Sequence, residues 1–387
     1  MTTDPVYLDH NGTTPIAPEV ADAMWPYLTE RFGNPSSATP QGRIARQAVD
    51  IAREQLAALL GAHTDEITFT SGGTEANNLA IRGAARALGL DAARQSRRTL
   101  LTSVVEHPAT AQPVALLAEA GWRVHRLGVD AEGRVDPAAV PEGPLDVGTL
   151  ILAQNEVGTV QPVAEVAEMV HAAGGAMHAD AAQAVGKIPV EVDDLGVDLL
   201  SVAGHKLYAP KGVGALYVRR GTAIEPVLVG AGQERGLRPG TENVASIVGL
   251  GAAAALAASL LADPVAGDGS EAAREERLRE LLWERLAAAI PNLVRVSPRT
   301  GCLPNTLMVA VPGRIGSELL DAASGVTAST GSACHSGVHT PARTLLEMGI
   351  APDLALGALR LSLGRATTEA DVERVASDLA RGASFAG

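Results

Sequence analysis

The stretch "EITFTSGGTEANNLA", residues 66–80, combines a short apolar run, two glycines and a longer segment of helical composition. Gly72 and Gly73 permit a tight backbone turn, so the stretch predicts a strand, a turn and a helix. Thr74 then lies where a hydroxyl and the free N–H groups of a helix start face an anion such as a phosphate. A plain capped turn, with Thr74 as the N-cap and Glu75 in the first helical turn, fits the same residues equally well.

The alternation of strand-like and helix-like segments continues along the chain. Apolar runs occur in "RTLLTSVVE", "GTLILAQN", "AMHADAA", "VDLLSVAG" and "GALYVRR", and helical stretches such as "PVAEVAEMVHAAG" lie between some of them. Strands joined by helical crossovers pair in parallel, so the pattern predicts an α/β fold with a mostly parallel sheet covered on both faces. Because only a short turn precedes "GALYVRR", we expect that strand to pair antiparallel.

The composition changes near residue 262, where "ADPVAGDGSEA" indicates a linker or exposed loop. An amphipathic helical segment, "AAREERLRELLWERLAAAI", and the strand-like "NTLMVAV" follow it. A chain of 387 residues is long for one core, so we expect about two domains. We assign residues 15–261 to a large domain, and residues 1–14 with 262–387 to a smaller α+β domain.

The overall charge argues against polyanionic partners. Lysine and arginine total 31 against 44 aspartate and glutamate residues, a formal net charge of −13, and the basic residues are scattered. We therefore expect neither nucleic acid nor an anionic membrane as the main partner. The start of the chain has no basic or apolar signal-like region, and the small-apolar run at residues 251–262 is short of the ~20 residues of a membrane span. These features predict a soluble, cytoplasmic protein.

Two strand ends carry groups that suit one cofactor. Asp180 comes just after the apolar run of "AMHADAA", and Lys206 ends the run in "SVAGHKLYAP". The carboxyl ends of strands in an α/β sheet line the ligand crevice. A lysine amine condenses with an aldehyde, a carboxylate keeps a pyridine nitrogen protonated, and the turn at Thr74 suits a phosphate, so the set predicts pyridoxal phosphate (PLP). A helix-capping aspartate is the alternative for Asp180.

Eleven stretches also match a family in the right order. They are "YLDHNGTTP", "FGNPSS", "TSGGTEANNLAI", "SVVEHPA", "NEVGTVQPV", "HADAAQAVGK", "GHKLYAPKGVGALYVRR", "GQERGLRPGTENV", "LPNT", "GSACHSG" and "ALRLSLGRATTEADV". On these stretches nearly the whole chain resembles the cysteine desulfurases and selenocysteine lyases of the class V aminotransferase group. The resemblance implies a fold-type-I, PLP-dependent homodimer that removes sulfur or selenium from an L-amino acid and leaves alanine.

The resemblance also implies which residues contact the cofactor ring. Lys206 would bond covalently to the cofactor aldehyde, and Asp180 would face the pyridinium nitrogen. Gln183 would contact the ring hydroxyl, and His107 of "VEHP" would stack over the ring.

The phosphate and the substrate have their own implied contacts. Thr74 and His205 would hold the phosphate, together with Thr241 of "RPGTEN" reaching in from the other subunit. Asn155 and Arg360 would hold the substrate carboxylate, a role that suits the two-pronged guanidinium.

Cys334 in "TGSACHSGVHT" would be the nucleophile. Its thiolate would attack the substrate sulfur, giving alanine and a persulfide for transfer to an acceptor such as an iron–sulfur scaffold or a sulfur carrier. A free thiol has a pKa of about 8.5, so we expect a nearby base, for which His335 and His107 are the candidates. Many desulfurases carry a serine where Ala203 stands, so one phosphate contact is missing here.

Other functions stay open at this stage. The "GSACHSG" and "VAGHK" contexts look closer to selenocysteine lyases, so selenocysteine is the alternative substrate to L-cysteine. A "GLGAAA" string at 249–254 fits a dinucleotide fingerprint and raises an NAD-dependent oxidoreductase, but no clear strand precedes it. A non-catalytic scaffold of the same fold is the other rival. We expect no metal site, because "CHSGVH" lacks a fourth ligand and a zinc spacing, and we expect Cys302 to be a small, partly buried residue.

Overall fold

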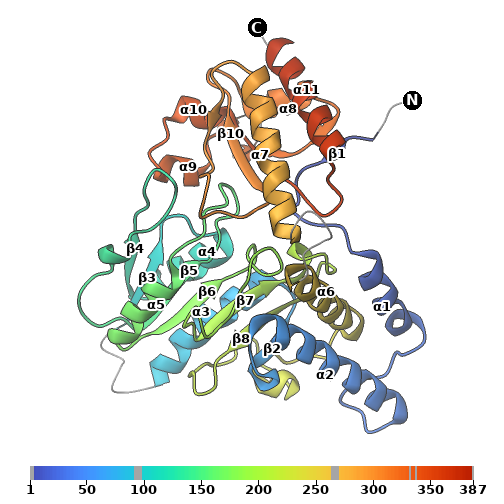
Figure 1. The fold of residues 1–387 in the computed structure, drawn as a ribbon. Coiled ribbons are helices and arrows are strands. Elements are labelled where there is room, and N and C mark those ends of the chain that lie inside the picture. Colours follow the sequence, from blue (N-terminus) through green and yellow to red (C-terminus); the bar gives the residue numbers. More distant parts are fainter. Residues whose placement is uncertain (1–3, 91–97, 263–269, 331–332, 336–337, 386–387) are drawn as a thin grey trace.

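The computed structural model describes residues 4–90, 98–262, 270–330, 333–335 and 338–385 (Figure 1). Its helices are α1 (Pro18–Thr29), α2 (Pro40–Leu60), α3 (Gly73–Leu90), α4 (Pro108–Glu119), α5 (Val163–Ala172), α6 (Val244–Ala262), α7 (Glu271–Ala289), α8 (Gly316–Ala322), α9 (Arg343–Glu347), α10 (Pro352–Leu356) and α11 (Glu369–Phe385). Its strands are β1 (Val6–Tyr7), β2 (Ile67–Thr70), β3 (Thr99–Ser103), β4 (Arg123–Leu127), β5 (Val147–Ile151), β6 (Ala176–Asp180), β7 (Leu199–Ala203), β8 (Gly214–Val218), β9 (Val294–Arg295), β10 (Thr306–Ala310), β11 (Val326–Thr327), β12 (Ser329–Thr330), β13 (Ala333–His335), β14 (Val338–Thr340) and β15 (Ala358–Ser362).

Seven strands form the larger sheet, in the order β2-β8-β7-β6-β5-β3-β4. The pairs from β7 to β4 are all parallel, whereas β8 runs antiparallel to both of its neighbours. The prediction of a mostly parallel α/β sheet is confirmed, and so is the antiparallel "GALYVRR" strand. Every residue of β2, β3, β5 and β7 is buried, which explains why these strands are near-continuous apolar runs in the sequence.

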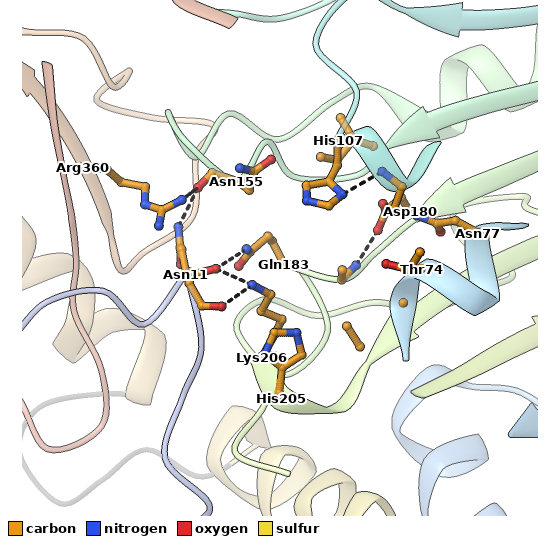
Figure 2. A pocket seen from close by; sticks show the side chains of 16 residues that line it. Asn11, Thr74, Asn77, His107, Asn155, Asp180, Gln183, His205, Lys206 and Arg360 are labelled. Carbon is orange, nitrogen blue, oxygen red and sulfur yellow. Dashed lines mark hydrogen bonds between the residues drawn. The ribbon is translucent and has the colours of Figure 1, made fainter. Parts of the chain in front are cut away.

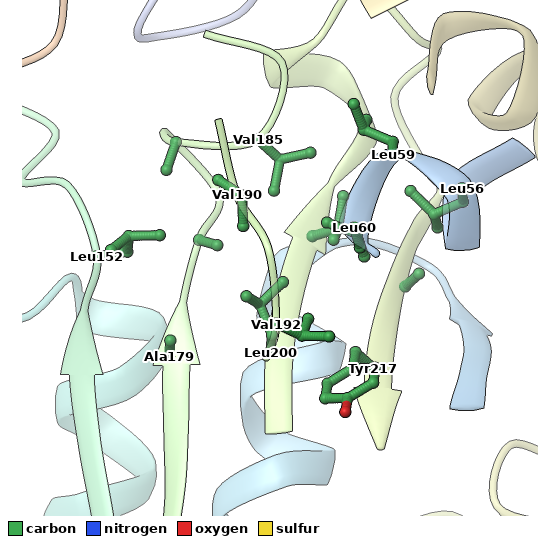
Figure 3. Close-up of a cluster of buried hydrophobic side chains, with 14 of the residues drawn as sticks. Leu56, Leu59, Leu60, Leu152, Ala179, Val185, Val190, Val192, Leu200 and Tyr217 are labelled. Atoms are coloured by element: carbon green, nitrogen blue, oxygen red, sulfur yellow. The ribbon is translucent and has the colours of Figure 1, made fainter. Parts of the chain in front are cut away.

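The core on one face of this sheet lies between the strands and helices α2 and α6. Leu56 and Leu60 of α2 pack with Leu200 of β7 and Tyr217 of β8 (Figure 3). Helix α2 begins at the N-cap Thr39, whose side chain accepts a hydrogen bond from the Gly42 N–H. It ends at Gly61, whose φ of 64° is the left-handed conformation that glycine adopts without strain.

A second sheet lies beside the first, in the upper part of Figure 1. Its strand order is β12-β15-β10-β9, and α7, α8 and α11 pack with it around a separate hydrophobic core. Val6 and Leu8 from the start of the chain belong to this second core. We therefore propose residues 1–14 and 262–387 as one domain and residues 15–261 as the other.

Helix α6 is longer than the apolar run that marks it in the sequence. It spans 19 residues with a mean hydropathy of 2.1, and it is the one helix among the described residues that is long and apolar enough to cross a membrane. It packs against α1 and α2, and 56% of its most apolar window is buried, as in a core helix. The "GLGAAA" string lies inside this helix, without the strand before it that a dinucleotide site requires.

Candidate active site

A pocket of about 380 Å³ lies at the carboxyl ends of the parallel strands (Figure 2). Ile151, Asp180 and Ala203, which end β5, β6 and β7, contribute to its lining. The start of α3 and the segment around Asn11 complete it. This is the edge where ligands of open α/β sheets bind, because strand ends bring residues from several crossovers together.

Lys206 enters the pocket from the single helical turn that follows β7. Its Nζ donates to two main-chain carbonyl oxygens, 2.6 Å from that of Asn11 and 2.7 Å from that of Gly12. Burial, reinforced by the positive charge of Arg360, lowers the pKa of Lys206 to about 8. An appreciable fraction of this amine is therefore neutral near physiological pH, as a nucleophilic amine must be.

Asp180 is buried at the end of β6, and its carboxylate is held on both sides. Oδ2 accepts from Asn77 Nδ2 at 2.6 Å and from the Thr110 hydroxyl at 3.4 Å, and Oδ1 accepts from the Ala182 N–H at 3.1 Å. These donors fix the direction of the carboxylate. Asp180 thus stands as a positioned acceptor for a cationic ring nitrogen.

The start of α3 follows directly on a glycine turn after β2. Gly72 has a φ of 151°, which few residues with a side chain adopt, and an added Cβ on Gly73 would lie 3.1 Å from Cβ of Ala203. Ala203 therefore packs against the turn. The Thr74 side chain lines the pocket at this point, where a helix N-terminus favours an anion.

Three more predicted residues line the same pocket, namely His107, Gln183 and His205. His107 caps α4, its Nδ1 accepting from the Ala109 N–H at 3.1 Å, and burial lowers its pKa. The positive charges of Lys206 and two further lysines add to burial and lower the pKa of His205 to about 4. Both imidazoles are therefore neutral at physiological pH.

Arg360 reaches the pocket from β15 of the second sheet. Its Nη1 donates to the main-chain oxygen of Asn155 at 3.1 Å, and its Nη2 forms an ion pair with Asp9 at 2.6 Å. Lys206, Arg360 and Asn155 meet around Asn11 (Figure 2). The structure thus gathers the predicted substrate-binding residues beside the predicted cofactor lysine.

Two predicted residues, Thr241 and Cys334, are not among the described residues that line this pocket. Thr241 is exposed and lies away from the lining of its own chain's pocket. The backbone of Cys334 lies in the β13–β14 hairpin, where it pairs with His339, whereas the side chains of Cys334 and His335 lie outside the described residues. Their predicted roles stay predictions.

Comparison with known proteins identifies the family. The model of the aminotransferase class-V family matches residues 6–375. The chain belongs to this family. Over 375 residues it is 43% identical to a protein named cysteine desulfurase from Trichormus azollae, covering 96% of this chain and 90% of the relative. It is 42% identical over 376 residues to cysteine desulfurase NifS of Azotobacter vinelandii, covering 96% and 90%. A solved structure titled NifS-like protein has a TM-score of 0.89 and 34% identity, covering 98% of this chain and all of that one.

These comparisons confirm the predicted family, its fold-type-I α/β architecture and its dependence on pyridoxal phosphate. They also support a cysteine desulfurase against the NAD-dependent rival.

The sequence interpretation missed two polar residues of the site. Asn77 lies three positions after Thr74 on α3, so helical spacing already places it on the same side of the helix. Asn11 stood within the quoted "YLDHNGTTP", but nothing local in that string indicates that its carbonyl would meet Lys206.

Proposed function

We propose that this chain is a PLP-dependent cysteine desulfurase that removes sulfur from L-cysteine, releases L-alanine and leaves a persulfide on Cys334. The observation that carries this proposal is that Lys206 and Asp180 line the same pocket. An amine whose pKa is lowered to about 8 lies in the same pocket as a carboxylate fixed by three donors. The relatives named cysteine desulfurase support the reaction class.

The residues present fit pyridoxal phosphate. Lys206 supplies the amine for the aldehyde, Asp180 the acceptor for the ring nitrogen, and the Gly72–Gly73 turn leaves room for an anion at the helix start. Thr74 and His205 are the donors for the phosphate, and Gln183 and His107 contact the ring. When bound, the cofactor supplies an electron sink for the negative charge formed at the substrate Cα.

The chain's own residues hold the substrate and take its sulfur. Arg360 and Asn155 bind the substrate carboxylate, and in the free enzyme Asp9 holds the guanidinium at 2.6 Å. The Cys334 thiolate forms an S–S bond to the substrate sulfur as the Cβ–S bond breaks. The electron pair of that bond remains with Cβ, which takes up a proton and becomes the methyl group of alanine. His107 and His335 are the candidate bases that deprotonate the thiol.

The working form we propose is a cytoplasmic homodimer that passes its sulfur to an acceptor protein, such as an iron–sulfur scaffold or a sulfur carrier. Thr241 is exposed, as a residue that completes the partner's phosphate site must be. Trp25 and Phe32, on α1 and just after it, are 63% and 77% exposed. Large apolar side chains so exposed favour burial against another protein surface.

The test compares the two cysteines of the chain. Cys334→Ser is expected to keep the absorbance of the bound cofactor and to lose alanine formation from L-cysteine. Cys302→Ser is the matched control, because a serine hydroxyl still accepts the hydrogen bond that Arg279 donates to Cys302 Sγ at 3.1 Å. Full alanine formation by Cys334→Ser would contradict the persulfide route.

The same assay, run with L-selenocysteine beside L-cysteine, separates the two substrate classes. A wild-type preference for selenocysteine that survives in Cys334→Ser would assign the chain to the selenocysteine lyases instead. Selenium leaves carbon more readily than sulfur and needs no protein nucleophile.

A further inference from the structure

Lysine is rare in this chain, and one of the lysines lies at an unusual position. Only three of the 31 lysine and arginine residues are lysines, namely Lys187, Lys206 and Lys211. Lys206 has a chemical reason to be a lysine, and Lys211 is exposed. Lys187 is neither exposed nor part of the pocket lining. Because almost all other cationic residues of the chain are arginines, a lysine at this position calls for a physical reason.

Lys187 lies directly behind the active-site pocket. Its Nζ donates to Oε1 of Gln183 at 2.5 Å and to Oδ1 of Asn11 at 3.1 Å. Because these two amide oxygens accept from Lys187, the nitrogen ends of both amides must face elsewhere. Gln183 Nε2 points to the Asn11 main-chain oxygen at 2.9 Å, and so presents the donor end of this amide on the pocket side.

Asn11 connects this amine to Lys206. Its main-chain oxygen accepts from Lys206 at 2.6 Å (Figure 2). Its side chain is held by Lys187 at 3.1 Å, by Asn305 at 3.2 Å and by Thr306 at 2.8 Å. The position of the carbonyl that holds Lys206 therefore depends on the hydrogen bonds to the Asn11 side chain. Lys187 supplies one of them.

The space behind Lys187 admits an ammonium and excludes a guanidinium. Lys187 lines a cavity of only about 10 Å³ together with the buried Glu275 and with Tyr208, about the volume of one water-sized sphere. Arginine carries a planar group with five donors, which has no room there. Burial and the charge of Lys206 lower the pKa of Lys187 to about 7; the neutral amine still has two N–H groups for the two amide oxygens.

We propose that Lys187 is a positioning residue of this active site. It fixes the Gln183 side-chain amide so that the donor end faces the cofactor ring, and it fixes the Asn11 side chain so that the main-chain carbonyl of Asn11 holds the Lys206 amine. The role of the Gln183 donor rests on the proposed function. The effect on Lys206 does not, because it is a property of the chain alone.

The test uses the reactivity of the three lysines toward cyanate, followed by peptide mapping, in the full chain before cofactor is added. In Lys187→Met the hydrophobic stem remains and the amine is lost. The midpoint of the pH–reactivity curve of Lys206 is expected to fall by about half a unit to one unit, because the Asn11 carbonyl that stabilises the ammonium form loses its fixed position; this is about three- to tenfold faster carbamylation on the acid side of the curve. Lys211 provides the internal reference, and Lys211→Met the matched control. Arg360, Asp9 and Asp180 also act on the charge of Lys206, and the substitution leaves all three in place.

A second readout is the dissociation constant of pyridoxal phosphate, expected to weaken about tenfold in Lys187→Met as the Gln183 donor loses its fixed direction. Lys187→Met leaves the buried carboxylate of Glu275 without a nearby amine. If this variant does not fold, the double variant Lys187→Met with Glu275→Gln removes that charge and allows the same measurements. An unchanged Lys206 midpoint and an unchanged cofactor affinity in a folded variant would overturn the proposal and leave Lys187 a structural residue. If the wild-type chain fails to bind pyridoxal phosphate, the proposed function is wrong. The pH–reactivity curve of Lys206 would then still test whether Lys187 positions the Asn11 carbonyl.

Discussion

Replacing Arg360 by methionine should slow the reaction of Lys206 with its cofactor in a pH-dependent way. The pKa of Lys206 is about 8 instead of the ordinary 10.5, so at pH 7 the neutral amine is about 300 times more abundant than in an unperturbed lysine. Burial is the main cause, and the positive charge of Arg360 is the next. The substitution also frees Asp9 from its 2.6 Å ion pair, and the freed carboxylate favours the ammonium. Both changes raise the pKa of Lys206.

We expect a rise of about one unit, the size of effect that a nearby charge produces, and therefore about tenfold slower loading of pyridoxal phosphate at pH 7. The assay follows the absorbance of the bound cofactor after mixing, between about pH 7 and pH 10, and borohydride reduction with peptide mapping confirms attachment at Lys206. The two proteins should converge at the alkaline end, where both amines are neutral. Arg343→Met is the control, since this exposed arginine pairs with Glu347 on α9, outside the pocket. A loading defect of equal size at every pH would refute the charge argument and indicate damage to the pocket.

Three further predictions concern groups around the sheet. Asn77→Ala removes a 2.6 Å donor from buried Asp180, and should weaken cofactor binding and lower the free energy of unfolding by about 1–2 kcal/mol, measured by cofactor titration and urea unfolding. Arg53→Met leaves Glu234 buried without its 2.7 Å partner, so urea unfolding should show a loss of about 3 kcal/mol or more. Burial raises the pKa of Glu106 to about 8; the native state then binds the proton more tightly than the unfolded chain, so this group makes stability fall as the pH rises from about 4.5 to about 8. Glu106→Gln should shrink that fall, and equal pH slopes of the unfolding free energy in the two proteins would contradict the assignment.

The sequence predicts those parts of the fold that are set by residues close together in the chain. Each strand of the larger sheet is an apolar run with its own turn or helix, so its existence, and even the reversed direction of β8, follows from neighbouring residues. Asp180 and Lys206 were found for the same reason. Asp180 is the last residue of β6 and Lys206 lies three residues after the end of β7, and strand ends of a parallel sheet meet at one edge.

The contacts that complete the site are not local. Asn11 touches residues from five distant segments, and its contacts with Asn155 and Lys206 exist only because the second sheet packs beside the first. No periodicity within "YLDHNGTTP" encodes those partners. Lys187 is similar. It lies four residues after Gln183, but nothing in that spacing indicates Asn11, whose side chain meets Lys187 and whose main-chain oxygen meets Gln183 and Lys206.

The site is assembled by one short segment, residues 7–12, that connects the two sheets. Asp9 forms an isolated bridge with Ser362 of the second sheet, Tyr7 belongs to β1, and two residues after Asp9 the Asn11 carbonyl holds the amine that follows β7 of the first sheet. An added Cβ on Gly12 would lie within 2.4–2.9 Å of the Asp9 carboxylate, so glycine at this position leaves room for the carboxylate that pairs with Arg360. Any shift of the second sheet relative to the first therefore moves Arg360, its partner Asp9 and the carbonyls that hold Lys206 as one unit. The geometry of substrate binding and the basicity of Lys206 are set together, because the same short segment fixes both.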